Sequence, residues 1–148
     1  MKSTSLHLAG LLLVVIAISA GAQSKTPAQR FAGTWNAQFQ GKTFTTLKLA
    51  AKDDQLTGSM TGANINLDKE GNLTSAEQSG SESEISDAKL AGDTLSFATK
   101  DGDSGETMKW KMQVKSDNEG ELLLVIPEPH MGIPTPRPWK ITRESPHP

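Results

Sequence analysis

Between Glu106 and Lys115 apolar and polar residues alternate without a break, and this pattern constrains the fold more than any other feature of the chain. Successive side chains of a β-strand point to opposite faces, so every second residue lies on the same face. The apolar face carries Met108, Trp110, Met112 and Val114, and the polar face carries Lys109, Lys111, Gln113 and Lys115. The segment therefore predicts a strand with one face in a core and the other in water.

Shorter apolar, β-branched or alternating runs recur along most of the chain, separated by turn residues. They cover 34–39, 43–49, 56–60, 65–67, 85–90, 94–99, 122–126 and 139–143. Between 85–90 and 94–99 lies the clearest hairpin turn, where Gly92 suits the positive φ of a tight connection. Short antiparallel strands remove their exposed edges by closing into a barrel or pairing two sheets. We therefore expect an all-β fold, a small antiparallel barrel of about eight or nine strands.

Three segments fall outside this strand pattern. Ser24 to Gly33 predicts a leader with one helical turn, in which Thr26 caps the helix and Pro27 takes its first position. The stretch 74–84 is Ser-rich and acidic with no apolar residue larger than Ala76, so we expect a mobile connection. The stretch 127–138 carries five prolines in twelve residues, which predicts an extended, stiff segment.

The first twenty-two residues have the composition of a secretory signal. Lys2 supplies the positive start, an apolar run extends from Leu8 to Ile18, and Ala20-Gly21-Ala22 offers a cleavage site. Because a membrane helix needs about 20 apolar residues, we expect export and cleavage near Ala22 rather than a membrane span. The predicted divisions are a signal peptide at 1–22, a linker at 23–28, one barrel domain at 29–144 and a disordered tail at 145–148. The expected location is extracytoplasmic, either periplasmic or secreted.

Charge and cysteine content restrict the partners of such a chain. After cleavage it would keep fourteen basic against seventeen acidic residues, a net charge of −3, which lacks the basic patch that nucleic acid requires. The chain has no cysteine, so neither a disulfide nor a thioether lipid anchor can form, and stability must come from packing and sheet hydrogen bonds. We expect a monomer.

Gly33 and Trp35 on the first predicted strand, after one helical turn, and Arg143 on the last strand resemble the signature of the calycin superfamily, the lipocalin-like barrels. The resemblance implies that Trp35 seals one end of a barrel and that Arg143 lies across it. A guanidinium stacked on an indole gains a cation–π energy of roughly 0.5 to 2 kcal/mol. The chain is also similar to short secreted bacterial domains of unknown function, through the opening Gly-x-Trp, the phrase 85–97 and the closing 139–143.

Catalytic and metal-binding patterns are weak in this sequence. Only His130 and His147 would remain after cleavage, and no Gly-x-Ser-x-Gly elbow, phosphate loop or His-Glu-x-x-His helix accompanies them. Asp101 to Glu106 places three carboxylates in six residues, but its spacing differs from an EF-hand loop and its Asp-Gly content suits a hairpin turn. We expect no catalytic residue, no metal and no other cofactor. A hydrolase that uses carboxylates is a distant alternative.

Ligand binding is the function that the pattern favours. Met108, Trp110 and Met112 could line an apolar pocket, although the same face could simply be core. Met131 and Arg137 lie in the proline-rich segment, which is stiff enough to present side chains at a barrel end. We therefore expect an exported, non-enzymatic binding module for a small apolar ligand or a protein partner. The alternative is an accessory interaction domain with a filled core, and an internal volume of about 300 Å³ or more would favour the ligand carrier.

Overall fold

The structure, a computed structural model, describes residues 23–127 and 132–145 as one helix and nine strands. The elements are α1 (Pro27–Phe31), β1 (Gly33–Phe39), β2 (Lys42–Lys52), β3 (Gln55–Leu67), β4 (Leu73–Glu84), β5 (Ser86–Ala91), β6 (Thr94–Lys100), β7 (Thr107–Val114), β8 (Glu119–Val125) and β9 (Trp139–Arg143). All pairings are antiparallel, which confirms the predicted all-β class. Among the described elements no helix is long and apolar enough to cross a membrane.

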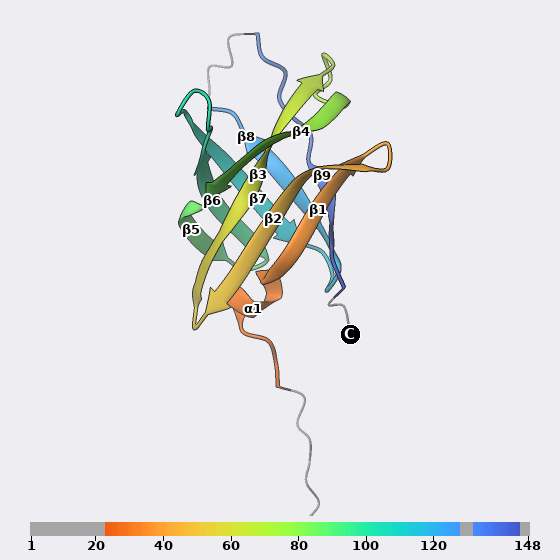
Figure 1. Ribbon diagram of the computed structural model, residues 1–148. Coiled ribbons are helices and arrows are strands. Elements are labelled where there is room, and N and C mark those ends of the chain that lie inside the picture. Colours follow the sequence, from red (N-terminus) through yellow and green to blue (C-terminus); the bar gives the residue numbers. More distant parts are fainter. Residues whose placement is uncertain (1–22, 128–131, 146–148) are drawn as a thin grey trace, which may run out of the picture.

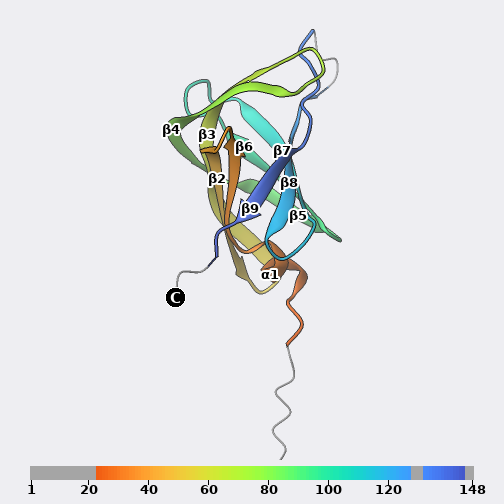
Figure 2. The ribbon, with the colours of Figure 1, turned by 90° about the vertical axis from the view of Figure 1, so that its right-hand side faces the viewer.

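The strands form a single sheet in the order β4-β3-β2-β1-β9-β8-β7-β6-β5. First and last strands are neighbours, since Trp35 of β1 pairs with Arg143 of β9. Figures 1 and 2 show the strands wrapping around a common interior, with α1 below its lower end. The two edge strands, β4 and β5, follow each other along the chain without a ladder between them in the described residues. The hydrogen-bonded sheet is therefore open, and closure into a barrel stays a prediction.

The short helix forms where the leader pattern predicts it. Thr26 Oγ1 accepts a hydrogen bond from the backbone N–H of Gln29 at 3.3 Å, and Gln29 Oε1 accepts one from the Thr26 N–H at 3.0 Å. This reciprocal capping satisfies two backbone donors at a helix start. The helix ends at Phe31, which is fully buried and so fixes the helix against the core.

Two predictions about strands are wrong. The runs 56–60 and 65–67 belong to one strand, β3, and the segment 74–84, expected to be a mobile connection, lies within β4. An edge strand is held by backbone hydrogen bonds to its neighbour and needs little apolar surface, so the absence of large apolar residues does not prevent pairing. Ala76, the fourth residue of β4, is buried and pairs with Ile65 of β3.

The core lies between the inward faces of the strands and is dominated by aromatic and branched side chains. The largest fully buried side chains are Trp35, Phe31, Phe44, Leu47, Leu95, Met112, Leu122, Ile141 and Thr45. The alternation predicted for 106–115 is confirmed, because Trp110, Met112 and Val114 are buried while Lys109, Lys111 and Gln113 are exposed.

Candidate functional site

Trp35 and Arg143 contact each other at the α1 end of the molecule. Trp35 is 1% exposed, and its indole N–H donates to the carbonyl of Phe31 at 2.8 Å. The guanidinium carbon of Arg143 lies 4.4 Å from the centroid of the Trp35 ring, and Nη2 donates to the carbonyl of Arg30. The contact between Arg143 and Trp35 expected from the sequence is therefore present. It ties the last strand to the first and to the helix.

Gly33 makes room for this arrangement. Its φ is +126°, in the region that disfavours other residues, and a Cβ there would lie 3.3 Å from Cδ of Arg143. The stem of Arg143 thus passes directly over the glycine. Burial lowers the pKa of Arg143 below its usual value, an effect that the charge of Asp117 opposes, and the group keeps its proton at any ordinary pH.

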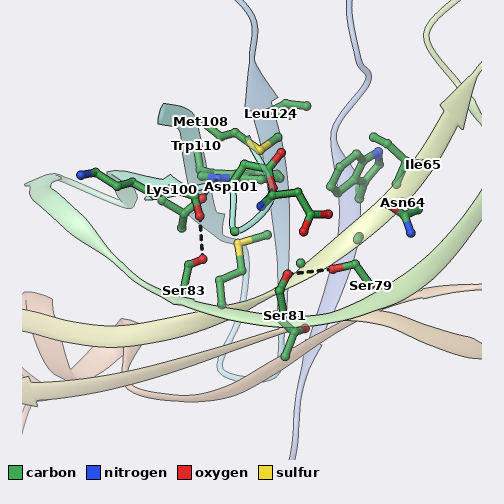
Figure 3. Close-up of a pocket in the computed structure, with 18 residues that line it drawn as sticks. Asn64, Ile65, Ser79, Ser81, Ser83, Lys100, Asp101, Met108, Trp110 and Leu124 are labelled. Atoms are coloured by element: carbon green, nitrogen blue, oxygen red, sulfur yellow. Dashed lines mark hydrogen bonds between the residues drawn. The ribbon is translucent and has the colours of Figure 1, made fainter. Parts of the chain in front are cut away.

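A pocket of about 180 Å³ lies away from α1, between the Thr61–Ile65 part of β3, the Ser79–Ser83 part of β4 and the turn after β6. Its apolar wall consists of Met60, Ile65, Met108, Trp110, Leu124 and Trp139. Figure 3 shows serine side chains of β4 on one side and Met108, Trp110 and Leu124 on the other. We call this cavity the end pocket. It combines an apolar wall with hydroxyl groups, a combination typical of small-molecule sites.

Packing holds the two indoles of the end pocket in place. The rings of Trp110 and Trp139 meet edge to face at 5.8 Å between centroids, and Phe97 stacks on Trp110 at 6.5 Å. Trp110 Nε1 donates to Thr99 Oγ1 at 3.0 Å. By contrast Trp139 Nε1 is buried and has no hydrogen-bond partner among the described residues. Such a donor costs about 1–3 kcal/mol. The α1 end has one as well, because Arg143 Nε is also buried without a hydrogen-bond partner among the described residues.

The polar side of the end pocket is built by a register shift. Between Thr61 and Ala63 the pairing of β3 with β4 slips, and Gly62 lies at this irregularity. A Cβ on Gly62 would lie 2.4 Å from Ser79 Oγ and 2.5 Å from Ser81 Oγ, so only glycine leaves both hydroxyls their space. The two hydroxyl oxygens lie 2.9 Å apart in a hydrogen bond. Bulges of this kind re-aim side chains and are common beside binding sites.

Across the pocket mouth β4 meets the end of β6 and the turn that follows. Ser83 Oγ donates to the carbonyl of Lys100 at 2.6 Å. Asp101 Oδ1 accepts from the N–H of Asp103 at 3.0 Å, and Asp101 Oδ2 accepts from Ser104 Oγ at 3.1 Å. The acidic loop is therefore organised by its own turn hydrogen bonds. Nowhere in the described residues do three acidic or histidine side chains gather to hold a metal ion.

The residues proposed from the sequence as ligand-binding do not all meet. Met108 and Trp110 line the end pocket, whereas Met112 is fully buried in the core and is not part of the lining. Arg137, which precedes β9, is exposed and lies against the β3–β4 turn. Its Nε donates to the Glu70 carbonyl at 3.0 Å, and its backbone N–H donates to the Gly71 carbonyl at 3.0 Å. The predictions for Met131 and His130 lie outside the described residues.

Sequence reasoning missed the serines of β4 and Trp139 as parts of a site. Serines at 79, 81 and 83 follow every second position, a strand period that was visible in the sequence. Their polarity hid the signal, because a strand face that lines a pocket is ordinarily recognised by apolar residues.

Comparisons of the chain with protein-family models, with curated proteins and with solved structures find no match. The likeness to lipocalin-like barrels therefore rests on Gly33, Trp35 and Arg143, and any function must be argued from the end pocket itself.

Proposed function

We propose that the protein is an exported, non-enzymatic binding module that holds one small, largely apolar molecule in the end pocket. The observation that carries the proposal is a pocket whose apolar wall, with two buried indoles, lies opposite the half-buried Ser81 and the exposed Ser79. A small molecule with an apolar body and one polar end matches this combination of an apolar wall and hydroxyl groups.

The volume of the end pocket limits the ligand. Common small-molecule sites span about 300–1,000 Å³, while an apolar cavity of about 150 Å³ holds one benzene ring. The end pocket, at about 180 Å³, thus suits a single ring with a one- or two-atom substituent, or a short chain. This volume is below the roughly 300 Å³ that we expected of a ligand carrier from the sequence, so that criterion is not met. The proposal is therefore restricted to molecules of about the size of one ring.

A lipocalin-like barrel remains part of the proposal. The backbone N–H of Ile85, between β4 and β5, donates to the carbonyl of Gly58 on β3 at 2.9 Å. The chain thus passes without a break from β4, which pairs with β3, to β5, which pairs with β6. This continuity supports closure of the sheet between β4 and β5.

Export rests on the Lys2 to Ala22 pattern. It is tested by expressing the full chain and sequencing the N-terminus of the exported product, which should begin at Gln23.

We infer a non-enzymatic role from the bonding of the hydroxyls. Ser79 and Ser81 bond to each other, and Ser83 bonds to a backbone carbonyl. An activated nucleophile instead needs a general base within hydrogen-bond reach. The partners of these serines are another hydroxyl and a backbone carbonyl. Neither is a general base, so neither raises the nucleophilicity of a serine oxygen.

Binding is tested with toluene and benzyl alcohol, titrated into the protein while tryptophan fluorescence and proton NMR shifts are recorded. Both probes should bind with a dissociation constant of about 1 mM or tighter, as expected for seven or eight well-packed heavy atoms. Ser81→Leu should weaken binding of both about tenfold, because the larger side chain occupies the pocket. Ser96→Leu, the same change on an outward-facing position of β6, is the control and should leave binding unchanged.

Failure of both probes to bind, or equal binding by the Ser81→Leu variant, would reject the proposal. The packed interior around Met112 would then favour the accessory domain with a filled core.

A further inference from the structure

Trp139 brings a buried, unpartnered hydrogen-bond donor to the lining of the end pocket. The residue is 7% exposed, and its Nε1 has no hydrogen-bond partner among the described residues. The second indole of the same wall differs, because Trp110 Nε1 donates to Thr99 Oγ1 at 3.0 Å. A buried indole N–H is ordinarily hydrogen-bonded. A ligand atom that accepts a hydrogen bond would therefore supply the partner that Trp139 lacks.

Two other donors of the lining are already open to water. Asn64 and Lys100 are both exposed, and Figure 3 shows the Lys100 side chain extending away from the labelled serines. A ligand that bonds to either of them only replaces water, so the net gain is small. A ligand that bonds to Trp139 Nε1 instead relieves a buried donor that bonds to nothing. Discrimination between ligands by their acceptor atom should therefore arise at Trp139.

Contact with this nitrogen requires a small adjustment of the pocket wall. Because Trp139 Nε1 is buried, a neighbouring side chain must move before a ligand atom can touch it. Met60 and Met108 belong to the same lining, and unbranched methionine side chains adapt readily to a ligand. The Trp139 ring itself is held edge to face by Phe44 and Trp110, at 5.4 and 5.8 Å between centroids. The donor thus sits on a fixed ring beside adaptable neighbours.

We propose that the end pocket selects a neutral molecule of about one ring whose polar atom accepts a hydrogen bond from Trp139 Nε1. Suitable acceptors are a carbonyl oxygen, an ether oxygen or a nitrile nitrogen. This inference rests on the proposed binding function and specifies its ligand class. Neutrality follows from the apolar wall, where a charge would lose its hydration without compensation. An apolar ring without an acceptor still fits the pocket but leaves the donor unpaired.

The test compares benzonitrile with phenylacetylene, two probes of the same shape that differ at the terminal atom. The nitrile nitrogen accepts a hydrogen bond, whereas the alkyne ends in a C–H group. Dissociation constants are measured by NMR titration for the wild-type protein and for Trp139→Phe, which removes the N–H and keeps an aromatic ring. The preference for benzonitrile over phenylacetylene should fall about threefold to tenfold in the variant, as expected for the loss of one hydrogen bond.

Trp110→Phe is the matched control. It makes the same change in the same wall but removes an N–H that already bonds to Thr99. Both variants enlarge the pocket, and a larger pocket affects two probes of one shape alike. The preference for benzonitrile should therefore stay close to the wild-type value in Trp110→Phe.

A second measurement follows the donor directly in the wild-type protein. The chain has three tryptophans, and the two variants identify the indole N–H resonances of Trp110 and Trp139. Benzonitrile should move the Trp139 N–H resonance downfield, because a hydrogen bond deshields the proton. Phenylacetylene carries the same ring but no acceptor and should not produce this shift.

Each outcome has a distinct meaning. Binding of both probes with an unchanged preference in Trp139→Phe would retain the pocket and overturn the inference about the acceptor. Equal responses of the Trp139 N–H resonance to both probes would also overturn it, and they decide the question alone if Trp139→Phe does not fold. If neither probe binds to the wild-type protein, the proposed function fails and the inference fails with it.

Discussion

The α1 end and the end pocket are parts of one sheet, yet side chains fill the interior at the first and leave a cavity at the second. At the α1 end Trp35 is fully buried, its N–H is bonded to Phe31, and Arg143 covers its face. At the end pocket Trp110 and Trp139 border a cavity. Each end leaves one buried donor without a hydrogen-bond partner among the described residues, Arg143 Nε at the α1 end and Trp139 Nε1 at the end pocket. The strand period is the same at both ends. The residues placed on the inward face determine whether the interior is filled or left open.

A glycine makes room for a neighbour at each end, with different results. Gly33 lets the stem of Arg143 pass, and that side chain closes the interior. Gly62 leaves room for the hydroxyls of Ser79 and Ser81 beside the pocket, and these short side chains leave space. From this difference we expect the free energy of unfolding to depend chiefly on the α1 end, and ligand binding to depend on the end pocket.

The largest expected effect is that of Trp35→Ala. Removing a fully buried indole deletes its packing and leaves a cavity, so the free energy of unfolding should fall by about 3–5 kcal/mol. Urea denaturation, followed by circular dichroism, measures the loss. A loss below about 1 kcal/mol would contradict the sealing role of the residue and remove the contrast between the two ends.

Arg143→Ala should have a smaller effect that is coupled to the first. The guanidinium gains a cation–π energy of about 0.5–2 kcal/mol from the Trp35 ring, and this part is already lost when the ring is absent. The double variant should therefore lose less stability than the sum of the two single variants. Strict additivity in the same urea experiments would show that the two side chains do not interact energetically.

Most of the fold could be predicted from the sequence because its signals are local. Thr26 and Pro27 mark a helix start, and the alternation of 106–115 fixes both a strand and its buried face. β4 was missed because the partner that stabilises it, β3, pairs through backbone atoms that carry no sequence signal. Whether β4 and β5 close the sheet depends on the path of the chain through Ile85, which is a tertiary property.

The candidate site was predictable only in part. Met108 and Trp110 lie on the face that the alternation identifies, and they do line the end pocket. The same alternation places Met112 on that face, but Met112 lies further along the strand than Met108 and Trp110 and is fully buried in the core. Periodicity reports which face a residue occupies and not how far along the interior it lies. Arg137 lies outside the end-pocket lining, because its hydrogen bonds to the backbone carbonyls of Glu70 and Gly71 set its position.

Gly62→Ala should have the smallest effect on stability and a clear effect on binding. The added Cβ would lie 2.4 and 2.5 Å from two serine oxygens, but both belong to short side chains that can rotate away. We expect the free energy of unfolding to fall by about 1 kcal/mol or less, because relief requires only a change of rotamer. Rotation would break the Ser79–Ser81 arrangement, so benzyl alcohol should bind severalfold more weakly while toluene changes less.

The matched control for this variant is Gly102→Ala, another change in the pocket lining. Its added Cβ would lie 3.4 Å from Cβ of Ser81, an ordinary contact that moves neither hydroxyl. It should leave both probes and the urea midpoint nearly unchanged. Equal weakening of benzyl alcohol and toluene by Gly62→Ala would show that the serine pair does not recognise the polar end, and loss of several kcal/mol would show that the register shift is needed for folding. Either result would contradict the proposed difference between Gly33, which is needed for packing, and Gly62, which is needed for ligand binding.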